Sequence, residues 1–221
     1  SSIQPQMSEG AIRNLEPWRE LEEYGHNIEG VWDGNGKELP YTINKTMMRV
    51  DLPQELHSGE SFEFRVKWNY HIIDRVNTTS IARGGYEFFE DHENYLYTIT
   101  QWYPRMCVFS DFEGWQNKQF TGRGEFALNF GNFTVSITVP ADHIVGSTGE
   151  CLNYPTVLSS EQWDRWQQAQ ESSTPVQIVT LDEAKKNEKR KNATETKTWI
   201  YKAENVRDFA WTASKKFVWD A

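Results

Sequence analysis

Alternation of apolar and polar residues is the main structural signal in this chain. Between residues 61 and 70 every second residue is apolar or aromatic, and charged residues fill most of the intervening positions. A period of two is typical of a strand with one buried face. The turn-forming segment 57–60 precedes this stretch and favours a hairpin or a tight crossover from an earlier strand. Strands are likewise predicted at 42–53, 95–102, 124–130, 132–139, 176–179, 197–203 and 216–219.

Helical signals are confined to short segments. Ser159 is followed three residues later by Gln162, and Thr180 is followed at the same spacing by Glu183. This spacing is that of a capping box, in which the first side chain accepts a hydrogen bond from the backbone three residues on, and the second side chain reaches back. We therefore expect a helix to begin at each position. The basic run 185–191, which the second helix enters, is interpreted as a solvated helix face or hairpin tip.

These elements predict the fold class. Short aromatic and β-branched strands that are not separated by long helices favour an all-β body, a β-sandwich or a domain of several sheets, with one or two short helical insertions. A further short helix is expected near residues 17–21, where Pro17 suits a first helical turn. We expect one domain over residues 1–221, truncated at its ends, with a helical and charged insertion at 155–195.

Charge and composition narrow the function. The chain has 221 residues, and 23 Lys and Arg stand against 32 Asp and Glu, which gives a net charge of −9. A phosphate backbone would be repelled, so nucleic-acid binding is not expected. The chain contains no stretch of the roughly 18 consecutive apolar residues that a membrane-spanning helix needs. The first residues lack the features of a signal peptide, so the protein is either cytoplasmic, or periplasmic or at the cell envelope with its leader missing.

Candidate chemistry within the chain is sparse. The five histidines are scattered, and the segment His92-Glu93-Asn94-Tyr95-Leu96 lacks the second histidine of the helical zinc motif, so no metal site is expected. The glycines of segment 122–127 have the spacing of a dinucleotide fingerprint, but predicted strands follow them instead of a helix. Ser147 lacks the strand, elbow and helix that surround a nucleophilic serine. Cys107 is interpreted as a small core residue, and whether it pairs with Cys151 stays open.

Five segments are more specific. They are 97–115, which contains Thr-Gln-Trp-Tyr-Pro-Arg; 122–126, Gly-Arg-Gly-Glu-Phe; 130–142, which begins Phe-Gly-Asn-Phe; 146–153, which begins Gly-Ser-Thr-Gly; and 206–211, Val-Arg-Asp-Phe-Ala-Trp. In this order they resemble the N-terminal domain of the M1 family of zinc aminopeptidases. The resemblance covers residues 69–153 and returns at 206–211.

The resemblance implies a saddle-shaped β domain that packs on a zinc-containing catalytic domain of the same chain. The zinc motif and the Gly-x-Met-Glu-Asn motif of the family would lie downstream, so the parent enzyme would hold Zn²⁺ and this segment would be inactive alone. In the family, a glutamine of the β domain helps to bind the first residue of the peptide substrate, and Gln101 matches its position. Tyr103 departs from the acidic or amide residue that many members carry two positions later.

The residues alone leave other interpretations of the same chain. Gln101 could form ordinary hydrogen bonds at a sheet edge or in the core, although its amide offers the donors and the acceptor that a peptide terminus needs. The ten tryptophans could include an aromatic platform that binds carbohydrate, with Trp115 as the test residue. A purely structural or protein-binding β-sandwich is the third possibility, because aromatic residues in strands are usually buried.

Overall fold

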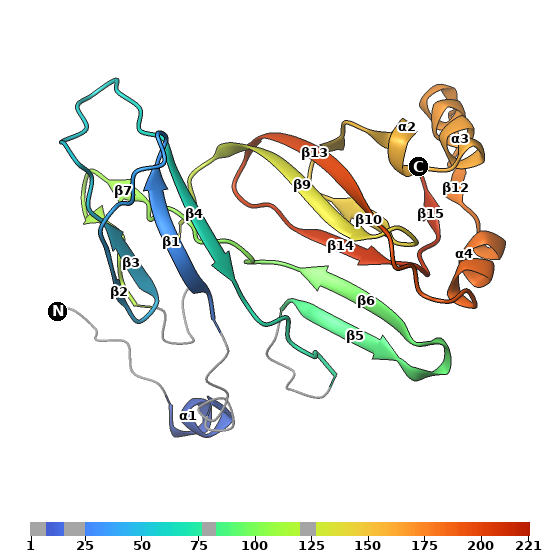
Figure 1. Cartoon of the computed structure of the whole chain (residues 1–221), viewed down its shortest axis with the longest axis horizontal. Helices are drawn as coiled ribbons and strands as arrows, with labels where there is room; N and C mark the ends of the chain where they lie inside the picture. Colours follow the sequence, from blue (N-terminus) through green and yellow to red (C-terminus); the bar gives the residue numbers. More distant parts are fainter. Residues whose placement is uncertain (1–7, 16–24, 77–82, 120–126) are drawn as a thin grey trace. The chain divides into compact units, whose positions relative to one another are not determined.

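A computed structural model of the chain describes residues 8–15, 25–76, 83–119 and 127–221. The chain divides into two compact units, of which unit 1 comprises residues 1–71 and 103–129 and unit 2 comprises residues 72–102 and 130–221. Short strands in several small sheets make up most of the regular structure in both (Figure 1). The all-β, multi-sheet class expected from the alternation is confirmed.

Unit 1 is built from pairs of short antiparallel strands. β1 pairs with β4, β2 pairs with β3, and β7 pairs with β8. In β4 the predicted alternation holds, because Val66 and Trp68 are half-buried while their neighbours are exposed. The elements of unit 1 are α1 (Glu9–Leu15), β1 (Asn27–Asp33), β2 (Tyr41–Asn44), β3 (Met47–Val50), β4 (Phe64–Asn69), β7 (Phe109–Ser110) and β8 (Gly114–Trp115).

Of the two connections expected from 42–53 to 61–70, a hairpin or a tight crossover, the hairpin is wrong. Residues 57–60 do form a turn, in which the Glu60 N–H donates to the His57 carbonyl at 3.0 Å. However, β2 and β3 form their own hairpin, with Lys45 in the left-handed region at φ +55°, and β4 pairs with the unpredicted β1.

Unit 2 contains larger sheets. A four-stranded antiparallel sheet has the order β10-β14-β6-β5, a three-stranded one has the order β11-β13-β9, and β12 pairs with β15. The long strands β9 and β13 run side by side in Figure 1. The strands are β5 (Gly85–Phe89), β6 (Asn94–Ile99), β9 (Gly131–Pro140), β10 (Ile144–Ser147), β11 (Glu150–Cys151), β12 (Gln177–Val179), β13 (Thr196–Val206), β14 (Trp211–Ser214) and β15 (Trp219–Asp220), with a 3-10 turn at Glu90–His92 between β5 and β6.

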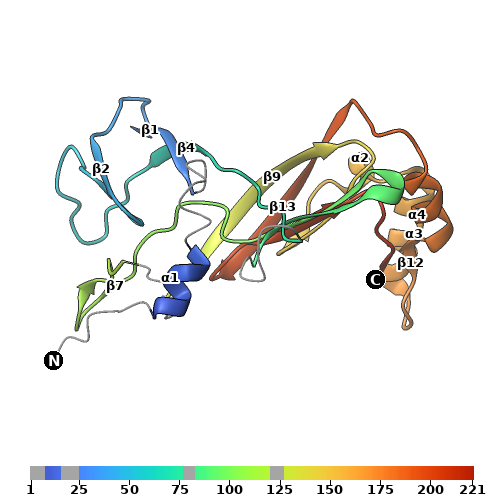
Figure 2. The same ribbon diagram turned by 90° about the horizontal axis from the view of Figure 1, so that it is seen from below.

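The helices of unit 2 begin where the capping boxes predict. α3 (Ser160–Glu171) starts after Ser159, and α4 (Leu181–Glu188) starts after Thr180, and both capping boxes are complete. A short helix, α2 (Tyr154–Val157), precedes α3. Figure 2 shows α3, α4 and β12 grouped at one end of unit 2.

The buried core lies mainly in unit 2. Trp199, Phe209, Ile99 and Ile178 are its largest fully buried apolar side chains. Trp199 comes from β13 and Ile99 from β6, so the two larger sheets both contribute to this interior. In the described part of unit 1, the buried apolar side chains are Val31 and Leu39.

Two further predictions have different outcomes. The helix expected near 17–21 lies outside the described residues. Of the strand expected at 124–130, residues 124–126 lie outside them, and residues 127–130 form no strand. Among the described residues, no helix is both long and apolar enough to cross a membrane.

Candidate functional site

The alternation predicts that Gln101 lies within a strand. In the structure it lies beyond the end of one. β6 ends at Ile99, opposite Trp211 at the start of β14. Gln101 follows in a bend with φ +53°, a left-handed conformation that is uncommon for a residue other than glycine. This backbone geometry turns the chain out of the extended conformation, so β pairing stops before Gln101.

The segment that carries Gln101 is held tightly on both sides. The next residue, Trp102, donates from its indole Nε1 to the carbonyl oxygen of the fully buried Phe209 at 3.0 Å. On the preceding side, Gly84 approaches so closely that a Cβ there would lie 2.9 Å from Thr100 Oγ1. The neighbouring residues therefore fix the left-handed conformation of Gln101. Local backbone strain persists at functional sites when the surrounding structure holds it in this way.

The Gln101 side chain itself is exposed. In the part of the chain that the structure describes, its amide forms no hydrogen bond. The two N–H donors and the carbonyl acceptor of the amide are thus available to a ligand. This differs from the alternative in which Gln101 satisfies a sheet edge or a core polar group.

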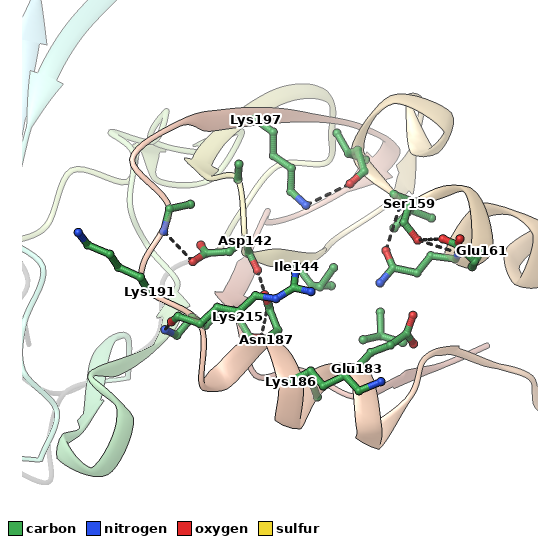
Figure 3. A pocket seen from close by; sticks show the side chains of 18 residues that line it. Asp142, Ile144, Ser159, Glu161, Glu183, Lys186, Asn187, Lys191, Lys197 and Lys215 are labelled. Carbon is green, nitrogen blue, oxygen red and sulfur yellow. Dashed lines mark hydrogen bonds between the residues drawn. The ribbon is translucent and has the colours of Figure 1, made fainter.

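A second candidate region is a cavity of about 650 Å³ within unit 2. Its walls are the β9–β10 connection, the end of α2, the start of α3, α4, and the chain between α4 and β13 (Figure 3). The volume lies in the range of small-molecule sites. The charged residues that line it are Asp142, Glu161, Glu183, Lys186, Arg190, Lys191, Lys197 and Lys215.

Lys197 extends from β13 into this cavity. Its Nζ donates to the Val157 carbonyl oxygen at 3.1 Å and lies 5.0 Å from the centre of the Trp199 ring (Figure 3). Burial lowers the pKa of Lys197 to about 8, although the negative charge of Asp142 acts in the opposite direction. An ammonium group has three N–H donors, so the protonated side chain keeps donors beyond the one used by Val157.

Asp142 is the most enclosed acid of the cavity. Its Oδ1 lies 2.8 Å from His143 Nδ1, and its Oδ2 accepts the Ala193 N–H at 3.0 Å. Burial acts to raise its pKa, but these hydrogen bonds and the charges of His143 and Lys215 outweigh it and hold the pKa of Asp142 below its usual value. Asp142 is therefore an ionised group whose oxygens already have partners.

Lys215 is buried against neutral oxygens. Its Nζ donates to the Arg190 carbonyl at 3.1 Å and to Asn192 Oδ1 at 2.6 Å. From α4, the Asn187 amide donates to the carbonyls of both Asp142 and Lys215, at 2.8 and 2.7 Å. Asn187 thereby ties the helix to two other walls of the cavity.

Sequence reasoning missed this cavity. The basic run 185–191 was interpreted as solvated, and Lys186, Arg190 and Lys191 are indeed exposed, but they also line one wall of the cavity. The run was the available signal, because five of its seven residues are basic. The opposite wall, with Lys197, comes from the strand β13, which the alternation predicted, but no local motif indicates that this strand lies opposite the basic run.

The other chemical candidates remain separate. Among the described residues, no three His, Cys, Asp or Glu side chains gather as a metal site would require. Cys107 and Cys151 are both free thiols, and Cys107 is half-buried with its Sγ 3.7 Å from Met47 Sδ. Trp115 is exposed, and the other described tryptophans are buried or half-buried. The described tryptophans therefore do not form a row of exposed indoles.

No family model, curated protein or solved structure matches the chain. The resemblance to the M1 aminopeptidases therefore rests on the five sequence segments and stays a prediction.

Proposed function

We propose that this chain is the non-catalytic N-terminal β domain of an M1-like zinc aminopeptidase, which removes N-terminal amino acids from peptides. It packs on the catalytic domain of the same protein, which holds the Zn²⁺, and Gln101 contributes to the substrate cleft. The ordered segments between residues 69 and 153 support the proposal, as does the all-β, multi-sheet fold.

The observation that carries the site assignment is the state of Gln101. The Gln101 amide is exposed and forms no hydrogen bond to the described residues, and it lies on a left-handed residue between Thr100 and the anchored Trp102, so it is suited to bind a ligand without rearrangement. A neutral amide also binds a peptide ammonium or carbonyl without neutralising the acids that recognise the ammonium group.

The test compares this chain with the full-length protein that contains it. We expect the chain alone to contain no zinc and to be inactive on an aminoacyl reporter, and the full-length protein to contain zinc and to be active. Zinc and activity in the 221-residue chain alone would overturn the proposal.

Within the full-length enzyme, Gln101→Ala is expected to lower kcat/KM at least tenfold, mainly through KM, because a hydrogen bond to a charged group is worth about 1.5–3 kcal/mol. Gln101→Gly should show the same loss, since it also removes the amide while glycine suits the left-handed backbone. Gln168→Ala, at an exposed position of α3, is the matched control and should leave kcat/KM unchanged. Unchanged kcat/KM in both Gln101 variants would contradict the site assignment.

A further inference from the structure

The cavity of unit 2 carries an excess of positive charge in an acidic chain. Five basic and three acidic side chains line it, whereas the whole chain has a net charge of −9. Basic residues are thus more frequent around the cavity than in the chain as a whole. A local excess of one sign in a concave site raises the local concentration of the opposite ion.

Two of the three acids of the cavity are already engaged. Asp142 is engaged by His143 and by a backbone N–H. Glu183 pairs with Arg165 at 2.5 Å and accepts the capping hydrogen bonds at the start of α4. These two carboxylates are therefore poor counter-ions for a second cation, whereas Glu161 is exposed and accepts from the Ser159 hydroxyl at 2.9 Å.

The basic side chains are not compensated in the same way. In the described residues none of the five forms an ion pair: Lys186, Arg190, Lys191, Lys197, Lys215. The two least exposed of them donate only to neutral oxygens. Asp142 interacts electrostatically with Lys197 and Lys215 without forming a direct ion pair with either. A buried or half-buried cation without a directly paired anion is unfavourable, and an anionic ligand would relieve this.

Apart from Ser159, Gln162 and Asn187, the uncharged residues that line the cavity are apolar. Ile144, Val157, Leu158, Val179 and Ala184 line it and are buried. A ligand that reaches the ammonium of Lys197 would also lie against these side chains. Its body would therefore be apolar, while its head group would be charged.

We infer that this cavity binds a small organic anion, with a carboxylate or phosphate head group at Lys197 and a short apolar body against Ile144, Val157 and Val179. The site is distinct from Gln101 and does not depend on the proposed peptidase function. The head group accepts hydrogen bonds from Lys197 Nζ, and the rim cations Arg190 and Lys191 add longer-range attraction.

The test uses the 221-residue chain and three probes followed by amide NMR: hexanoate, inorganic phosphate, and hexylamine as the charge-reversed control. We expect hexanoate to give saturable shifts confined to cavity residues such as Ile144 and Ala184, and hexylamine to give none. Tighter binding of phosphate than of hexanoate would identify a phosphate head group, and the reverse a carboxylate. Equal binding of hexylamine, or shifts spread over exposed lysines, would overturn the inference.

Two variants on the same strand sharpen the test. Lys197→Met should weaken hexanoate binding at least tenfold, whereas Lys202→Met, which removes an exposed lysine paired with Glu204, should not change it. Equal affinity in both variants would also overturn the inference.

A wild-type measurement covers the case in which Lys197→Met fails to fold. Hexanoate should slow acylation of Lys197 by an amine-reactive ester several-fold, as read by peptide mass spectrometry, and should leave Lys202 unaffected. If hexanoate gives Lys197 no protection, the inference is wrong.

Discussion

The two units of the chain are both built mainly from antiparallel strands but bury them differently. In unit 2 sheets of three and four strands are covered by side chains of other elements, and Trp199, Phe209 and Ile99 are almost completely buried. In unit 1 the described sheets have two strands each. Large apolar side chains of unit 1 are well exposed: Ile12, Ile43, Leu52, Leu56, Phe64, Met106, Phe109, Phe112 and Trp115.

This difference indicates where the folding free energy comes from. Two-stranded sheets are marginally stable by themselves, whereas three or more strands with a buried face are stable. The surface ion pair Lys67–Glu29 between β4 and β1 adds little, because exposed pairs are worth at most about 1 kcal/mol. Burial of apolar area, the dominant stabilising term, is concentrated in unit 2.

The largest expected effect tests this directly. Phe209→Ala removes a fully buried ring from unit 2 and should lower the free energy of unfolding by about 3–5 kcal/mol. Phe112→Ala removes a phenylalanine ring of unit 1 that is 79% exposed, and should change the free energy of unfolding by less than about 0.5 kcal/mol. Urea unfolding followed by circular dichroism measures both. Losses of similar size would show that the contrast between the units is wrong.

Sequence reasoning succeeded where the signal was local. The capping boxes at Ser159 and Thr180 depend on residues three positions apart, and both helices begin there. Alternation also located β9 and β13, since each is long enough to show its period. Which strands pair is a non-local property, and the pairing of these two was not predicted.

β1 shows why other strands were missed. Its register shifts between Ile28 and Gly30, which breaks the period of two. A Cβ at Gly30 would collide with the Trp32 ring as it is placed here, so glycine allows the ring this position. The bend at Gln101 was missed for a related reason, since Thr100 and Trp102 on either side continue a strand-like composition through a residue with positive φ.

A smaller effect separates tight packing from turn conformation. Gly149 and Gly36 have φ of +85° and +84°, so alanine at either position would have the same left-handed φ. In unit 2 a Cβ at Gly149 would fall on the Lys202 carbonyl oxygen and 2.8 Å from Ala203 Cβ, whereas at Gly36 in unit 1 none of the described residues lies within 4 Å.

We expect Gly36→Ala to cost about 1 kcal/mol, the price of a left-handed residue, and Gly149→Ala to cost about 2–4 kcal/mol because overpacking adds to it. Thermal and urea unfolding of the two variants give the comparison. Equal costs would mean that the close approach of Gly149 to β13 is not maintained in solution.

The smallest expected effect concerns alkaline pH, which acts on unit 2 through Lys197. Its pKa is lowered to about 8 by burial, against the opposing charge of Asp142, and it is about 10.4 in an unfolded chain. Protonation is therefore less favourable in the folded state, and this penalty is relieved progressively as pH rises from about 8 to about 10.4. Relative to Lys197→Met, the wild-type free energy of unfolding should increase by about 1–2 kcal/mol between pH 7 and 9.5.

Four other groups of unit 2 act in the opposite direction, which is why the prediction is made for a difference between two proteins. Burial raises the pKa of Tyr97, of Cys151, of Tyr201, and of Tyr154 to about 12, so the unfolded chain ionises first and stability falls as pH rises through 9 to 10. These contributions are common to wild type and Lys197→Met and cancel between them. If the difference between the two proteins stays constant over this pH range, Lys197 is solvated like the exposed lysines of unit 1, and the enclosed character of the cavity is refuted with it.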